Sequence, residues 1–83
     1  MKQERILIVD DEPLAREVIQ EILDREGYQT IAVENGELAI EVAGKVSFDL
    51  LLADIRMPKM NGLELVQAFK ELSPETVPVL ITG

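Results

Sequence analysis

Two short apolar runs in this chain end directly in aspartate. Residues 6–9 are followed by Asp10 and Asp11, and residues 50–53 are followed by Asp54. An unbroken apolar run of this length is typical of a strand buried on both faces of a parallel sheet. Such a sheet holds its ligands at the carboxyl ends of its strands. The two runs therefore predict an α/β domain with a small acidic pocket at one edge of its sheet.

Helical patterns separate the strand-like segments. Pro13 suits a first helical position and Gly27 a C-terminal stop, so we expect a helix from Pro13 to about Glu26. A second helix is expected over the apolar positions 38–46, and Asn61 can cap a third. Strands that alternate with helices indicate a parallel sheet with right-handed crossovers. The strands are expected near residues 5–9, 29–33, 50–53 and 77–81.

Composition excludes several kinds of site. The 83 residues include no histidine and no cysteine, which excludes a Ser-His-Asp centre, a Cys-His centre, a thiolate or imidazole zinc site and a disulfide framework. The net charge of -8, from 16 acidic and 8 basic residues, opposes direct contact with nucleic acid. The apolar runs fall far short of the roughly 18 to 20 residues that cross a bilayer. We therefore expect a soluble cytoplasmic protein that contacts neither nucleic acid nor membrane.

The three aspartates predict carboxylate chemistry with a cation. Asp10, Asp11 and Asp54 should meet at one edge of the sheet, and Mg²⁺ held by one or two carboxylates and several waters is an economical way to offset their repulsion. A cation that bridges an incoming phosphoryl group allows a neighbouring carboxylate to attack phosphorus and form an aspartyl phosphate. Thr82 follows the fourth strand at the same edge, where its hydroxyl can donate to a phosphoryl oxygen.

A structural explanation of the same residues is also available. Asp10 and Asp11 precede Pro13 and can simply cap the first helix, and Thr82 can be an ordinary polar strand end. Two adjacent aspartates with a third on another strand favour a functional site over capping alone.

The chain resembles the receiver domain of two-component response regulators. The resemblance is carried by ILIVDDEP at residues 6–13, DIRMPKMNG at 54–62 and ITG at 81–83. It implies a flavodoxin-like parallel sheet of strand order 2-1-3-4 with helices on both faces. It also implies phosphorelay signalling, with a sensor histidine kinase or a small phosphodonor as the source of the phosphoryl group. These motifs are most similar to those of regulators that activate transcription through an ATPase domain.

The resemblance assigns a role to each residue of the site. Asp54 would be the phosphoacceptor, and Asp11 and Asp54 would ligate Mg²⁺ together with the backbone carbonyl of Arg56. Asp10 would hold the metal through water. Thr82 would be the switch hydroxyl that contacts the phosphoryl group.

One departure from the family pattern is large. Family receivers continue through a further helix, a fifth strand and a final helix, so residues 1–83 are interpreted as a receiver truncated after the fourth strand. The lysine that ends the fifth strand of the family is not in this chain, and phosphorylation is expected to be slow. The fourth strand would then be an open edge along Val79, Leu80 and Ile81, which predicts self-association as a symmetric homodimer.

Two other functions compete with phosphoacceptance. An Mg²⁺-dependent phosphohydrolase working through an aspartyl intermediate usually carries a general acid two residues after its nucleophile, and Glu12 stands there after Asp10. An assembly-competent or engineered receiver fragment would keep only a vestigial metal pocket. We expect no enzyme, beyond self-catalysed phosphorylation and dephosphorylation.

Overall fold

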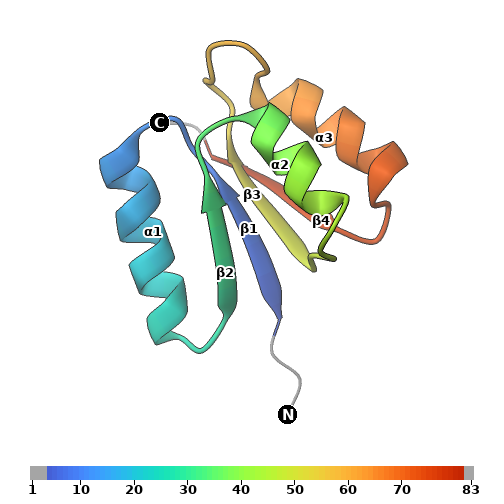
Figure 1. Ribbon diagram of the computed structural model, residues 1–83. Helices are drawn as coiled ribbons and strands as arrows, with labels where there is room; N and C mark the ends of the chain where they lie inside the picture. The colour runs from blue at the N-terminus through green and yellow to red at the C-terminus, as the bar shows by residue number, and fades with distance from the viewer. Residues whose placement is uncertain (1–3, 82–83) are drawn as a thin grey trace.

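The computed structural model describes residues 4–81, in which strands and helices alternate along the chain (Figure 1). All the expected elements are present, and most bounds agree with the prediction to within one residue. The second helix is shorter than expected. It ends at Ala43, and residues 44–46 form a turn that follows it. The elements are β1 (Arg5–Val9), α1 (Pro13–Arg25), β2 (Gln29–Val33), α2 (Gly36–Ala43), β3 (Leu50–Asp54), α3 (Gly62–Leu72) and β4 (Val77–Ile81).

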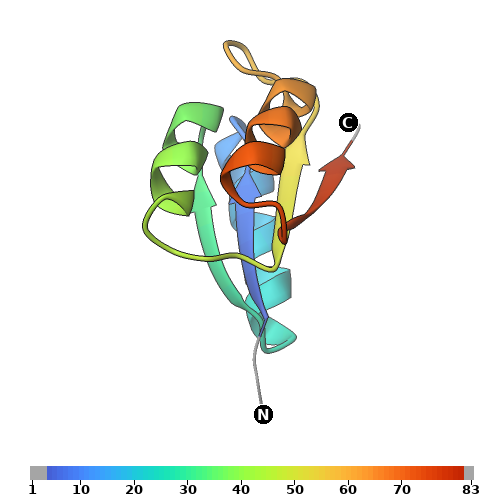
Figure 2. The ribbon, with the colours of Figure 1, turned by 90° about the vertical axis from the view of Figure 1, so that its right-hand side faces the viewer.

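The sheet is parallel and has the strand order β2-β1-β3-β4, which confirms the implied topology. Strand β1 lies between β2 and β3, so the order of the strands reverses at β1 and β3. Figure 2 shows α2 and α3 on one face of the sheet and α1 behind it. The fold is therefore of the flavodoxin-like kind, with helices on both faces.

Local signals in the sequence explain where the helices begin and end. Asn35 caps α2 by accepting a hydrogen bond from the Leu38 amide at 2.8 Å. Asn61 and Glu64 form a reciprocal capping box at the start of α3. Beyond α1, Gly27 takes a φ of 94°, a conformation that side-chain-bearing residues rarely adopt.

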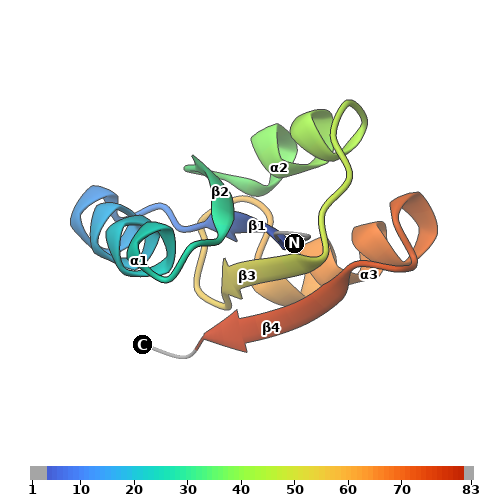
Figure 3. The same cartoon turned by 90° about the horizontal axis from the view of Figure 1, so that it is seen from below.

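The core lies between the sheet and the α2–α3 layer. Its buried members come from β1, β3, α2, α3 and the adjoining loops, and they include Leu7, Leu51, Leu65 and Phe69. Helix α1, seen alone on its side of the sheet in Figure 3, buries no residue completely. Among residues 4–81, no helix is both long enough and apolar enough to span a membrane.

Candidate metal and phosphoacceptor site

Two hydrogen bonds and burial hold Asp10 at the carboxyl end of β1. Its amide donates to the carbonyl oxygen of Val33 at 3.2 Å, and its Oδ1 accepts from the amide of Glu12 at 3.0 Å. Only 6% of the residue is exposed. The side chain is therefore fixed at the edge where β1 ends, next to the exposed Asp11.

Asp54 is the last residue of β3 and is half-buried. Its Oδ1 accepts a hydrogen bond from the amide of Arg56 at 2.9 Å. Within residues 4–81 the structure records no hydrogen bond to its other carboxylate oxygen. One oxygen is thus oriented by the loop that follows, and the second remains available to a ligand.

The three predicted aspartates do come together. One carboxylate oxygen each of Asp10, Asp11 and Asp54 lies within 4.8 Å of the other two. These residues come from adjacent strands, at the point where the strand order reverses. Hard carboxylate oxygens at this spacing suit a small divalent cation such as Mg²⁺, so the residues present fit the metal that the sequence predicted.

The loop between β3 and α3 borders this cluster. Its start and end are drawn together because the Gly62 amide donates to the carbonyl oxygen of Ile55 at 3.2 Å. A side chain at Gly62 would not fit, since a Cβ there would lie 2.8 Å from the backbone oxygen of Asp54. The glycine thus lets α3 begin directly against the end of β3.

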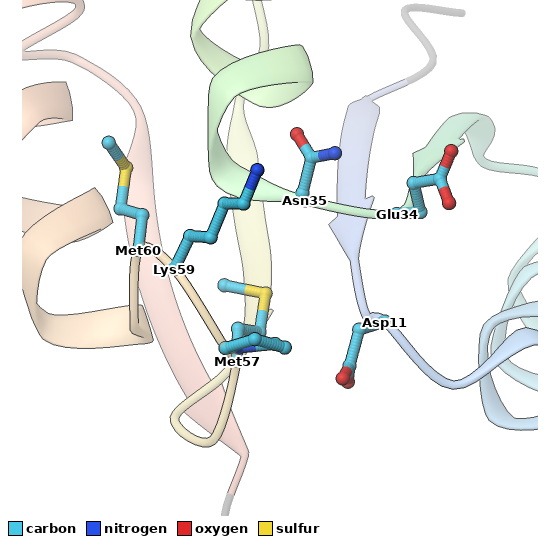
Figure 4. Close-up of a pocket in the computed structure, with 7 residues that line it drawn as sticks. Asp11, Glu34, Asn35, Met57, Lys59 and Met60 are labelled. Atoms are coloured by element: carbon cyan, nitrogen blue, oxygen red, sulfur yellow. The ribbon is translucent and has the colours of Figure 1, made fainter.

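An open pocket of about 220 Å³ lies beside the acidic cluster. In Figure 4, Asp11 stands on one side of this pocket and Lys59 and Met60 on the other. Lys59 is exposed. The pocket brings together three loops that follow β1, β2 and β3, and its lining residues are Asp11, Glu34, Asn35, Met57, Pro58, Lys59 and Met60.

Sequence reasoning missed one contact of the site. The guanidinium of Arg16, in the first turns of α1, donates from Nη1 to the backbone carbonyl oxygen of Asp10 at 2.8 Å. An arginine on an amphipathic helix is usually solvated, and no spacing rule in the sequence singles this one out. The predicted switch residue, Thr82, lies outside the described residues.

The chain matches the family model of the response regulator receiver domain over residues 6–83. It is 38% identical to sporulation initiation phosphotransferase F of Bacillus subtilis over 83 residues, which cover all of this chain and 67% of that protein. It is 42% identical over 78 residues to the autoinducer 1 sensor kinase/phosphatase LuxN of Vibrio campbellii, covering 94% of this chain. The match spans only 9% of that kinase, so receiver sequences like this one occur within much longer proteins.

Solved structures agree with the sequence relatives. The response regulator TrrA of Thermotoga maritima, crystallised in complex with Mg²⁺-BeF, superposes with a TM-score of 0.90 at 39% identity, over 96% of this chain and 70% of that one. The same regulator has been solved in complex with the histidine kinase ThkA. The family match, the strand order and the three clustered aspartates agree, and this chain belongs to the response regulator receiver domain family, whose role is phosphorelay signalling.

Proposed function

We propose that this receiver accepts a phosphoryl group on Asp54 in a reaction that requires Mg²⁺. The observation that carries the proposal is the meeting of three carboxylates from two neighbouring strands within 4.8 Å. Helix capping does not explain why the three aspartates meet, because the residue that caps α1 is Glu12 and not an aspartate.

The residues suited to hold Mg²⁺ are Asp11, Asp54 and the backbone carbonyl of Arg56, with Asp10 acting through a water molecule. Asp11 and Asp54 are both accessible, whereas Asp10 is buried and one of its oxygens already accepts from the Glu12 amide. This difference supports direct ligation by the first two residues and an indirect role for Asp10. When bound, Mg²⁺ would offset the negative charge of the carboxylates and of the approaching phosphoryl group.

Asp54 supplies the nucleophile. The Arg56 amide holds Oδ1, and the other carboxylate oxygen attacks phosphorus. The new bond joins that oxygen to phosphorus, and the bond from phosphorus to the donor breaks, with its electron pair leaving on the donor. A phosphohistidine of a sensor kinase or a small acyl phosphate supplies the phosphoryl group. Because a kinase takes this group from ATP in the cytoplasm, we propose that the transfer occurs there. Thr82 is proposed, from its motif alone, to contact the transferred group.

A phosphohydrolase is the weaker alternative. Its general acid would be Glu12, but Oε1 of Glu12 accepts from the Leu14 amide at 3.3 Å as the N-cap of α1. That interaction directs the carboxylate to the helix rather than to a leaving group. We therefore propose that the protein stores a phosphoryl group and does not turn over substrate.

Intact mass measurement after long incubation with excess acyl phosphate and Mg²⁺ tests this proposal. We expect one stable phosphoryl adduct, which Asp54→Asn and EDTA both abolish, while the exposed-site control Glu41→Gln retains it. Continuous release of phosphate that Asp54→Asn does not abolish would support the hydrolase instead, because the nucleophile of that alternative is Asp10. No adduct after exhaustive incubation would reject phosphoacceptance and support a receiver fragment with a vestigial metal pocket.

We also propose that the chain pairs with a second copy through the β4 edge. Within residues 4–81, β4 bonds only to β3, and Val77 and Val79 on it are 57% and 40% exposed. An exposed apolar edge strand is a template for pairing, and a two-fold contact covers the same edge on both copies.

Sedimentation at increasing concentration tests the pairing. Val79→Lys should shift the protein towards monomer, while Leu63→Lys, an equally drastic change at an exposed position of α3, should not. A parent chain that sediments as a monomer at every concentration would contradict the proposal.

A further inference from the structure

The middle of the β3–α3 loop is positioned by side-chain packing alone. The loop's ends are hydrogen-bonded, at Arg56 to Asp54 and at Gly62 to Ile55. Residues 57–60 all lie within the described part of the chain, and the structure records no hydrogen bond made by any of them. Two methionines therefore hold this stretch, Met57 buried in the core and Met60 half-buried against it.

Met60 packs against the first residue of α2, which is a glycine. A Cβ built on Gly36 would lie 2.6 Å from Sδ, 3.0 Å from Cγ and 3.1 Å from Cβ of Met60. Gly36 is buried, and the cap that Asn35 makes to Leu38 fixes this end of α2. Figure 4 shows Met60 and Lys59 reaching from the loop along the start of α2, across the pocket from Asp11.

The contact reaches the loop backbone as well as a flexible side chain. Rotation about the side-chain torsions of Met60 can move Sδ and Cγ away from an added methyl group. It cannot move the Met60 Cβ, which is bonded to the backbone. A methyl group at position 36 therefore has to push the loop and the start of α2 apart by a few tenths of an ångström.

We propose that Met60, seated on the bare backbone of Gly36, is a positioning residue for the metal site. The loop it fixes begins at Arg56, whose amide orients Asp54 and whose carbonyl is a proposed ligand. Mg²⁺ demands a nearly ideal octahedral arrangement, so small displacements of a ligand weaken its binding. The inference rests on the proposed function, because it concerns the Mg²⁺ site described above.

The test is a double-mutant cycle read by Mg²⁺ affinity, measured by titration calorimetry. Gly36→Ala should weaken Mg²⁺ binding by about tenfold, as is typical when a residue that orients metal ligands is disturbed. Met60→Ala alone should also weaken Mg²⁺ binding, because the loop loses its packing contact with Gly36. In the Met60→Ala background, Gly36→Ala should cause little further loss, since the methyl group then has room.

The melting temperature in EDTA gives a second readout, because Gly36→Ala should affect it differently in the parent and in the Met60→Ala background. Gly36 does not have a positive φ, so alanine suits its backbone and raises helix propensity. Gly36→Ala should therefore lower the melting temperature in the parent and leave it unchanged or raise it in the Met60→Ala background. Gly44→Ala, whose Cβ would make only ordinary contacts of 3.4 Å and 3.7 Å, is the matched control at the other end of α2.

Two results would overturn the inference. One is equal loss of Mg²⁺ affinity on Gly36→Ala in both backgrounds, and the other is an unchanged affinity in Met60→Ala. Failure of the proposed function would look different, because the parent itself would then show no Mg²⁺ binding that depends on Asp54.

Discussion

The two faces of the sheet carry amphipathic helices of the same general kind, yet only one face is closed. Leu65 and Phe69 of α3 are 0% and 2% exposed, whereas Leu14, Val18 and Ile22 of α1 are 70%, 49% and 57% exposed. The α2–α3 face therefore supplies most of the buried apolar area that stabilises the fold. The α1 face buries less of its helix, and hydrogen bonds tie α1 to the sheet, from Gln20 and Asp24 to Thr30 of β2 and from Arg16 to the Asp10 carbonyl at the edge where the acidic cluster lies.

Phe69→Ala should produce the largest effect if the α2–α3 face holds the fold. Its ring is among the largest fully buried side chains, and such truncations cost about 3 to 5 kcal/mol of unfolding free energy. Urea denaturation measures the loss. A cost similar to that of a surface substitution would show that the two faces do not differ as described.

Arg16→Ala should have an intermediate effect, although α1 buries no residue. The lost hydrogen bond to the Asp10 carbonyl should cost about 1.5 kcal/mol, the lower end for bonds made by charged groups, because the guanidinium is half-exposed. Arg25→Ala is the control on the same helix, since its exposed pair with Glu21 contributes about 0.5 kcal/mol or less. If both variants lose equal stability, Arg16 has no special link to the site.

Asn61→Ala should cost about 1 kcal/mol, because α3 loses its N-cap and half of its capping box. Asn61→Asp keeps an acceptor for the Glu64 amide and should be nearly neutral. Thermal unfolding of the two variants separates capping from a general intolerance at this position. A neutral Asn61→Ala would contradict the importance given to the start of α3.

Val18→Ala should have the smallest effect, within about 0.5 kcal/mol, as is usual for exposed positions. The measurement is again urea denaturation, carried out at low protein concentration so that self-association does not interfere. A loss of stability as large as that from a core truncation would mean that α1 packs against the sheet more closely than the exposure of Val18 indicates.

Much of the fold could be predicted because each element carries its own signal. The apolar runs before Asp10 and Asp54 predicted buried parallel strands, the resemblance to receiver domains implied that the two are neighbours, and parallel strands that end at one edge bring their carboxylates together. The helix pattern could not reveal that Val18 is half-exposed, since periodicity identifies an apolar face and not what covers it. The contacts of Arg16 with Asp10 and of Met60 with Gly36 depend on how loops from different strands approach one another, which local patterns do not encode.

We propose that Asp10, Asp11 and Asp54 form one Mg²⁺ site in which Asp54 is the reactive group. Calorimetric titration with Mg²⁺ tests it most directly, using the parent, Asp11→Asn, Asp54→Asn and the exposed control Glu41→Gln. We predict a single site in the parent and the control, and a loss of affinity of at least about tenfold in both aspartate variants. Equal Mg²⁺ affinity in all four proteins would show that the three aspartates do not form the Mg²⁺ site.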